Sequence, residues 1–262
     1  MSNTFTTAEE FRENWASGIN FLMEDDCVPF SFDFPSTADI VSALQANPNM
    51  KAISGTISDH LEVRDAGDYY RSLSCEELLE TSFQLTHFNI GEFDIPGQIL
   101  YGFGETVMRP WESFLRENGF SWDRCYAIMR VSGLATVTGY HVDSSNVLFW
   151  NVRGLKHFHG LRNPEEKAPL DWALQTDVNQ KGRPENIGNE DLLTIDTGDS
   201  QFIWNHIMTP HWVEAPELTF GINISHGGLR LNGRLAPREE AYYASKGWHE
   251  SPDKIWRKSY WE

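Results

Sequence analysis

The second half of the chain is a succession of short segments rich in β-branched and aromatic residues. Gly, Pro, Asn or Asp residues close each segment, and these residue types end strands and form turns. The segments are RCYAIMRVSG, ATVTGYHVD, NVLFWNVRG, LKHFHGL, LLTIDTGD, SQFIWNHIM, HWVEAPE and LTFGINISH. Strands at this spacing predict an antiparallel barrel or sandwich of the jelly-roll type, also called a double-stranded β-helix. We therefore expect a mainly β fold with helical decoration.

Residues 1–124 instead indicate mixed helix and strand. TTAEEFRENWASG has Thr6 or Thr7 as an N-cap and glutamates in its first turn. STADIVSALQANP has a capping box from Ser36 to Asp39 and a proline stop. SCEELLETSF and RPWESFLRENGF are two further predicted helices, and Pro at the start of the latter costs little.

No linker separates the parts of the chain, so we expect a single domain over residues 1–262. Within it, residues 1–124 form a helical and mixed elaboration, and residues 125–226 form the jelly-roll core. Residues 227–262 form a tail that is helical at first and then aromatic and charged. The segment from Lys167 to Asp191 is polar, and NQKGRPENIGNED, residues 179–191, is expected to be a long loop.

Charge and cysteine content exclude several classes of protein. The chain has 38 acidic and 21 basic residues, a net charge of −17, which disfavours nucleic acid and anionic membranes as partners. Three widely spaced cysteines form neither a disulfide framework nor a zinc knuckle and suit a reducing cytosol. The N-terminus lacks a signal-peptide core, and no apolar run approaches about 20 residues. We expect a cytoplasmic protein without a membrane span, whose aromatic tail suits internal packing or a homodimer contact.

One strand segment carries the strongest chemical signal, because His141 and Asp143 are separated by a single residue. In an extended strand the side chains of residues i and i+2 point to the same side. A third ligand is needed from a later strand, and His211, at a turn entering HWVEA, is the preferred candidate, with His206 as the alternative. Two histidines and one carboxylate form the facial triad of non-haem Fe(II) oxygenases, which leaves coordination positions open.

Jointly, these motifs resemble the JmjC-like, cupin-fold branch of the Fe(II)/2-oxoglutarate oxygenases, and most closely its asparaginyl-hydroxylase-like members. The resemblance covers roughly residues 125–226 and rests on TGYHVDSSNVLFWNVRGLK, the Gly198-Asp199 turn and HWVEA followed by INIS. It implies that His141, Asp143 and His211 bind iron. It also implies that Lys156, in the VRGLK turn, pairs with the distal carboxylate of 2-oxoglutarate, assisted by Thr138.

Two further candidate cosubstrate contacts and some departures from the family pattern complete the comparison. Strand parity places Asn151 on one face with Val147 and Phe149, and the resemblance implies a polar cosubstrate contact at Asn223, twelve residues after His211. Other oxygenase branches carry an arginine about ten residues after the distal histidine, where this chain has Gly221, so Lys156 is the better counter-ion. The Gly-Asp turn precedes His211 by thirteen residues, and WNHIMTP replaces the usual Pro-aromatic approach. That longer approach is the reason that His206 stays an alternative ligand.

The function that we expect is Fe(II)- and 2-oxoglutarate-dependent oxidation of an unactivated C–H bond, with dioxygen as the oxidant. An intact carboxylate at Asp143 argues against a halogenase, while desaturation or cyclisation stays open alongside hydroxylation. The substrate would be a small molecule, an amino acid or a peptide side chain. Two alternatives are a metal-dependent cupin dioxygenase or isomerase that does not use 2-oxoglutarate, and a non-catalytic cupin-fold binding protein.

Overall fold

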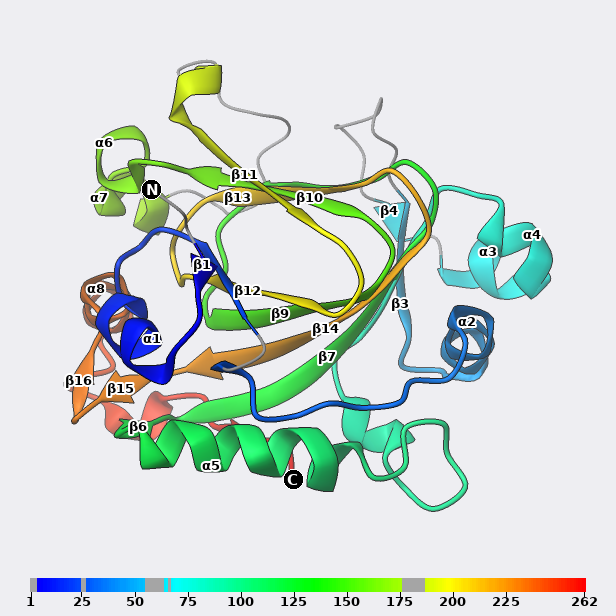
Figure 1. Ribbon diagram of the computed structural model, residues 1–262, viewed down its shortest axis with the longest axis horizontal. Coiled ribbons are helices and arrows are strands. Elements are labelled where there is room, and N and C mark those ends of the chain that lie inside the picture. The colour runs from blue at the N-terminus through cyan, green and yellow to red at the C-terminus, as the bar shows by residue number, and fades with distance from the viewer. Residues whose placement is uncertain (1–3, 25–26, 55–63, 66, 176–186) are drawn as a thin grey trace.

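The computed structural model describes residues 4–24, 27–54, 64–65, 67–175 and 187–262. Within these residues the fold is mainly β, with two sheets that face each other and helices on the outside (Figure 1). The described strands of the large sheet are, in spatial order, β1 (Thr4–Phe5), β2 (Phe21–Met23), β12 (Gln201–Asn205), β9 (Asn146–Arg153), β14 (Thr219–Gly227), β7 (Arg124–Ser132), β5 (Gln84–His87), β3 (Lys51–Ser54) and β4 (Arg64–Asp65), with β17 (Lys258–Ser259) paired to β7.

The smaller facing sheet has four described strands, in the order β11 (Leu192–Thr197), β10 (Lys156–Leu161), β13 (His211–Ala215) and β8 (Thr136–His141). A third, short sheet consists of β16 (Arg234–Leu235), β15 (Arg230–Leu231) and β6 (Phe120–Ser121). Most neighbouring strands run antiparallel, and the pairs β1–β2 and β17–β7 are parallel. The N-terminal region contributes β2 and β5 to the large sheet, so the two ends of this sheet come from chain segments outside residues 125–226.

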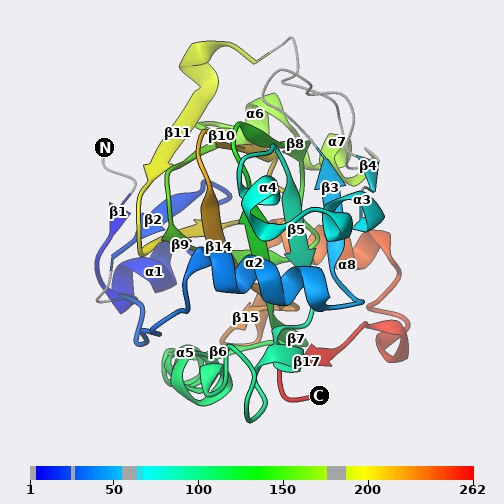
Figure 2. The same cartoon turned by 90° about the vertical axis from the view of Figure 1, so that its right-hand side faces the viewer.

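The helices lie on the outside of the two sheets, and Figure 2 shows α2 crossing in front of the large sheet. They are α1 (Ala8–Asn14), α2 (Thr37–Ala46), α3 (Gly67–Ser72), α4 (Cys75–Leu79), α5 (Arg109–Glu117), α6 (Pro164–Lys167), α7 (Leu170–Gln175) and α8 (Pro237–Ser245). A π-helical turn, Gly104–Met108, leads into α5, and short 3₁₀ turns cover Ile90–Phe93, Asn189–Asp191 and Pro252–Lys254. None of the described helices is long and apolar enough to cross a bilayer.

Strand alternation gives the large sheet two buried faces. On the outer face, Trp150, Phe202, Trp204 and Ile222 pack with α1, α2 and α5 in the main hydrophobic core. On the inner face, Val147, Phe149 and Ile203 pack against Phe158, Leu193 and Ile195 of the small sheet. Because both faces are covered, the central strands have no solvent-facing side and read as nearly continuous apolar runs.

Several local predictions are confirmed by the structure. Thr7 is the N-cap of α1 and forms a capping box with Glu10, and Ser36 caps α2 through the Asp39 amide. The predicted helices at 75–79 and 109–117 are present, as is the tail helix α8. The polar segment that follows Lys167 begins with α7, in which Leu170 and Ala173 bury an apolar face. Of the loop predicted over residues 179–191, residues 179–186 lie outside the described residues, and Asn189–Asp191 forms a 3₁₀ turn.

Candidate metal centre

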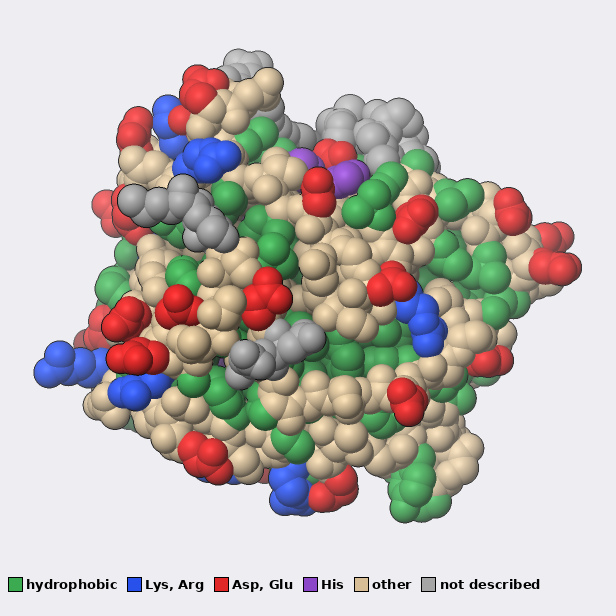
Figure 3. Space-filling view, viewed as in Figure 1, with side chains coloured by type: hydrophobic (Ala, Val, Ile, Leu, Met, Phe, Trp, Pro, Cys, Tyr) green, Lys and Arg blue, Asp and Glu red, His purple; other side chains and the backbone are tan. Residues whose placement is uncertain are grey.

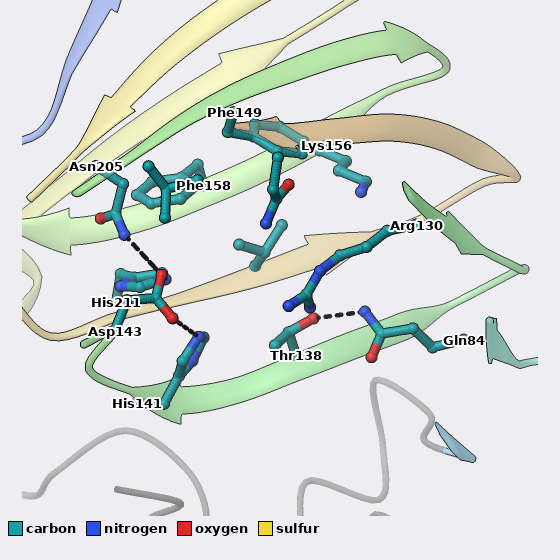
Figure 4. A pocket seen from close by; sticks show the side chains of 13 residues that line it. Gln84, Arg130, Thr138, His141, Asp143, Phe149, Lys156, Phe158, Asn205 and His211 are labelled. Atoms are coloured by element: carbon teal, nitrogen blue, oxygen red, sulfur yellow. Dashed lines mark hydrogen bonds and ion pairs between the residues drawn. The ribbon is translucent and has the colours of Figure 1, made fainter. Parts of the chain in front are cut away.

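His141, Asp143 and His211 come together between the two sheets. His141 ends β8, Asp143 follows it directly, and His211 opens the neighbouring strand β13, opposite His141 in the register. The next registered pair is Val213 with Thr138, so β8 has one more residue than β13 between the two pairs. This bulge lets the side chains of both His141 and His211 point inward. Their potential ligand atoms all lie within 4.8 Å of one another. Figure 4 shows the three side chains converging at one end of a pocket.

Backbone carbonyls fix which nitrogen of each histidine faces the centre. The Nδ1 atom of His141 is 2.6 Å from the carbonyl oxygen of Gly139, and that of His211 is 3.1 Å from the carbonyl oxygen of Thr209. A carbonyl only accepts hydrogen bonds, so each Nδ1 carries the proton and donates it. Each Nε2 therefore presents a lone pair toward Asp143, at 3.7 Å for His141 and 3.6 Å for His211. This is the tautomer that metal-binding histidines adopt.

The electrostatics of the centre favour a neutral imidazole beside an ionised carboxylate. Burial, together with the adjacent His141, lowers the pKa of His211 to about 3 against the opposing effect of Asp143. Burial by itself would raise the pKa of Asp143, but His211, His141, Arg130 and a hydrogen bond from Asn205 outweigh it and hold that pKa below its ordinary value. The ring of Phe158 stacks on His211, with centroids 5.0 Å apart, and closes its inner side.

The other end of the same pocket holds two cations. Lys156 begins β10 and is 3 % exposed, with its Nζ 4.9 Å from the centre of the Phe149 ring. Arg130, which the sequence analysis did not single out, reaches in from β7 (Figure 4). Among the described residues, no carboxylate forms an ion pair with either cation, and the Arg130 Nε has no hydrogen-bond partner. Asp143 attracts Arg130 only from a greater distance.

Burial disfavours the charged form of both side chains. Burial lowers the pKa of Lys156 to about 7, and the nearby charge of Arg130 contributes to the shift. Burial also lowers the pKa of Arg130. Two buried cations of like sign are costly unless an anion joins them. This end of the pocket is thus built for a negatively charged group.

Thr138 and Asn223 also line the pocket, as the sequence analysis expected of cosubstrate contacts. The Thr138 hydroxyl accepts a hydrogen bond of 3.1 Å from Nε2 of Gln84, a residue of β5 that sequence reasoning missed. The Asn223 Oδ1 is buried and has no partner among the described residues. An unpaired buried acceptor is uncommon in folded proteins and calls for an explanation, which a bound group would supply. Together with the open solvent at its mouth, the pocket has an empty volume of about 440 Å³.

Asn151 does not line the pocket. Its amide donates to the carbonyl oxygens of Gly154, Thr197 and Gly198, at 2.5, 3.2 and 2.9 Å. The expectation that Asn151 contacts a cosubstrate stays a prediction, because its N–H groups join two turns while its Oδ1 is buried without a partner among the described residues.

Those turns position Lys156. Gly154 adopts φ +84° in the turn between β9 and β10, where an added Cβ would lie 2.4 Å from the Leu218 carbonyl oxygen. The Gly154 amide donates to Oδ1 of Asp199 at 2.7 Å, and this hydrogen bond joins the Gly198-Asp199 turn to the turn that precedes Lys156. Only a residue without a side chain fits this conformation and this close approach.

His206 lies apart from the metal cluster. It is buried, with Nδ1 3.5 Å from Oδ1 of Asn20 and Nε2 3.4 Å from the Asn14 carbonyl oxygen. Burial lowers its pKa to about 4. His206 therefore packs as a neutral side chain against the N-terminal segment, and His211 occupies the place facing Asp143.

Two further histidines face outward. His157 and His159 lie on the outer side of β10, with the Nδ1 of His157 2.7 Å from Oδ1 of Asp196 and the ring of His159 stacked on Trp212. Figure 3 shows histidine beside acidic side chains at this face, where acidic groups are spread over the visible surface. Strand alternation thus separates these histidines from the inward-pointing Lys156 and Phe158.

Comparison with known proteins identifies the fold. No protein-family model matches the sequence, and no curated protein matches it. Among solved structures, Escherichia coli YcfD is similar over 95 % of this chain, with 14 % identity and a TM-score of 0.54. A structure of YcfD, described as a ribosomal oxygenase in complex with cobalt and succinic acid, is similar over 86 % of this chain, with 12 % identity and a TM-score of 0.50. The chain covers 59 % and 51 % of the lengths of these two structures.

Proposed function

We propose that this chain is an Fe(II)- and 2-oxoglutarate-dependent oxygenase of the JmjC-like cupin type, built on a double-stranded β-helix. The observation that carries the proposal is the composition of one pocket. It has three potential metal ligands at one end and, at the other, two cations that form no ion pair with any carboxylate of the described residues. A bound metal together with a dicarboxylate satisfies both ends, and neither alone does so.

The donor set fits a divalent metal. His141 and His211 offer unprotonated Nε2 atoms, and Asp143 offers a carboxylate, which is the facial set that non-haem iron oxygenases use. The Asp143 side chain is 28 % exposed, so one side of the cluster is open for a substrate to approach. Bound iron would supply the reduction of dioxygen that couples decarboxylation of 2-oxoglutarate, to succinate and carbon dioxide, to insertion of one oxygen atom into a substrate C–H bond.

The residues of this chain would bind and orient the cosubstrate. Lys156 and Arg130 would hold its distal carboxylate, with Thr138 and Asn223 as polar neighbours. The planar fork of Arg130 suits two parallel hydrogen bonds to one carboxylate, while Lys156 acts as a point charge. Phe149 and Phe158 make the walls apolar and limit water around the cosubstrate chain. Lys156 as the distal cation is the feature that supports the asparaginyl-hydroxylase-like branch.

A peptide or amino-acid side chain is the substrate class that we propose, and hydroxylation is the proposed outcome. The described ribosomal oxygenase with this fold supports such a substrate. The net charge of −17 also favours a basic peptide segment over an anionic partner. A small molecule is the alternative that a substrate screen distinguishes.

The test is the formation of succinate from 2-oxoglutarate by purified protein with Fe(II), in air, across a panel of basic peptides, free amino acids and small molecules. We expect succinate to form at a rate that rises with the right substrate, and Asp143→Ala to abolish it. A metal cupin enzyme of another type would transform substrate without succinate, and a binding protein would consume no dioxygen. Either result would refute the proposal.

A further inference from the structure

Asn205, the last residue of β12, lies against the metal cluster. It is 2 % exposed, and its Nδ2 is 3.0 Å from Oδ2 of Asp143 and 3.5 Å from Nε2 of His211. The amide therefore contacts two of the three potential ligands from the side of the large sheet (Figure 4). It falls in the WNHIMTP segment, where the sequence departs from the pattern of the family that it resembles.

The chemistry of the neighbours fixes the orientation of this amide. Asp143 is a carboxylate and can only accept hydrogen bonds, so the NH₂ end of Asn205 must face it. The Nε2 of His211 is also an acceptor, because its Nδ1 donates to the Thr209 carbonyl. The opposite end of the amide, Oδ1, is buried without a partner among the described residues. A buried amide that leaves one of its own atoms unsatisfied, while donating to a ligand pair, points to a role at that pair.

Backbone contacts hold Asn205 and Asp143 in this relation. Met208, in the loop between Asn205 and His211, adopts φ +53° and donates its amide to the Asp143 carbonyl oxygen at 2.9 Å. Its own carbonyl oxygen accepts from Nη1 of Arg238 at 2.6 Å. The loop is thus tied both to the residue that supplies the carboxylate and to α8, and the Asn205 amide cannot drift from Oδ2 without disturbing it.

We infer that Asn205 is a positioning residue for the metal ligand Asp143. Its hydrogen bond holds Oδ2, which lies 3.6 Å from Nε2 of His211, and so fixes the rotation of a carboxylate whose other oxygen, Oδ1, faces Nε2 of His141 at 3.7 Å. This inference rests on the proposed metal site but not on the identity of the cosubstrate or substrate.

The test compares Co(II) binding by the purified, metal-free proteins, using calorimetry and the visible absorption spectrum of bound Co(II). Asn205→Leu keeps the number and branching of the side-chain heavy atoms and removes both N–H donors, and Asn205→Ala removes them without any risk of a clash. We expect both variants to bind Co(II) about 10- to 100-fold more weakly, the usual loss when such an outer partner is removed. We also expect an altered spectrum, because the Asp143 carboxylate is then free to rotate and change the coordination geometry.

Asn223→Leu is the matched control, since Asn223 is a half-buried asparagine of the same pocket, with a buried Oδ1, that contacts none of the three ligands. It should bind Co(II) with the wild-type affinity and spectrum. Wild-type affinity and spectrum in folded Asn205→Leu and Asn205→Ala would overturn the inference while leaving the metal site intact. Failure of the wild-type protein to bind Co(II) at all would instead overturn the proposed function.

Discussion

Replacing Lys156 with Met removes the ammonium group and keeps most of the side-chain volume, so the variant isolates the charge. In the empty pocket the pKa of Lys156 is lowered from 10.5 to about 7, first by burial and then by Arg130. A shift of that size corresponds to roughly 5 kcal/mol of unfavourable energy for the charged form, at about 1.4 kcal/mol per unit. A carboxylate that binds between Lys156 and Arg130 recovers much of this energy.

The expected loss of cosubstrate affinity follows from these energies. Truncating one partner of a buried charge pair costs roughly 2–5 kcal/mol. Arg130 still faces the carboxylate in Lys156→Met, so we expect the lower part of this range, about 2–3 kcal/mol. That is a 2-oxoglutarate dissociation constant raised by about 30- to 150-fold. Arg130→Met should give a comparable loss, and the double variant should lose measurable binding, because the carboxylate would then be buried without any cation.

The assay is calorimetric titration of 2-oxoglutarate into the anaerobic Co(II)-loaded proteins. Lys246→Met is the matched control, because Lys246 also lies over an aromatic ring, that of Tyr242 at 5.3 Å, but on the exposed C-terminal side of α8. Its affinity should equal that of the wild type. Lys156→Met should also melt a few degrees higher than the wild type in the absence of cosubstrate, since it removes an uncompensated buried cation. Unchanged affinity in both Lys156→Met and Arg130→Met would refute the assignment of this end of the pocket.

Four further outcomes test other parts of the account. His211→Ala should abolish Co(II) binding in calorimetry, while His206→Ala should retain it; the reverse would make His206 the third ligand. The 2-oxoglutarate affinity should fall by up to about tenfold per unit as pH rises above 7, because binding requires the Lys156 ammonium, whose pKa in the empty pocket is about 7; calorimetry in buffers of different ionisation enthalpy should show proton uptake at pH 8. Glu239 is fully buried and its pKa is raised by burial from 4.5 to about 7, so the folded state holds a proton that the unfolded state loses, and the free energy of unfolding should fall by up to about 3 kcal/mol between pH 4.5 and 7; urea titrations should show a weaker fall for Glu239→Gln. Chelation of metal should leave the far-UV circular dichroism spectrum intact, because a chain of this length buries enough surface to fold without an ion.

The sequence supports the ligand cluster unevenly. His141 and Asp143 follow from strand parity alone, because i and i+2 side chains share a face. Choosing His211 as the third ligand required the family resemblance, since nothing in the local sequence distinguishes it from His206, five residues earlier. The structure separates the two histidines by packing His206 against Asn14 and Asn20. Strand parity also places Asn151 on the same face as Phe149, but it does not predict which residues along that face lie within the pocket. Asn151 lies beyond the pocket and binds turn carbonyls.

Arg130 and Asn205 illustrate what pattern reading misses. Arg130 lies in CYAIMRVSG, a strand that is buried on both faces, so alternation gives no sign of which side chain points inward. The feature of the sequence that could have identified Arg130 is its charge, because an arginine within an apolar central strand needs an anion to compensate it. Asn205 depends on how β12 and the loop before His211 meet the loop after Asp143, which are contacts between residues more than 60 positions apart in the chain. A contact between residues so far apart in the chain cannot be predicted from the local sequence.

A crystal structure of the protein grown anaerobically with Co(II) and 2-oxoglutarate would show whether one pocket holds both the metal and the dicarboxylate. We expect one anomalous cobalt peak in contact with Nε2 of His141, one oxygen of Asp143 and Nε2 of His211. We also expect one end of the dicarboxylate to bind that ion and the other end to lie between Lys156 and Arg130. A cobalt peak elsewhere, or 2-oxoglutarate bound away from both cations, would contradict this expectation.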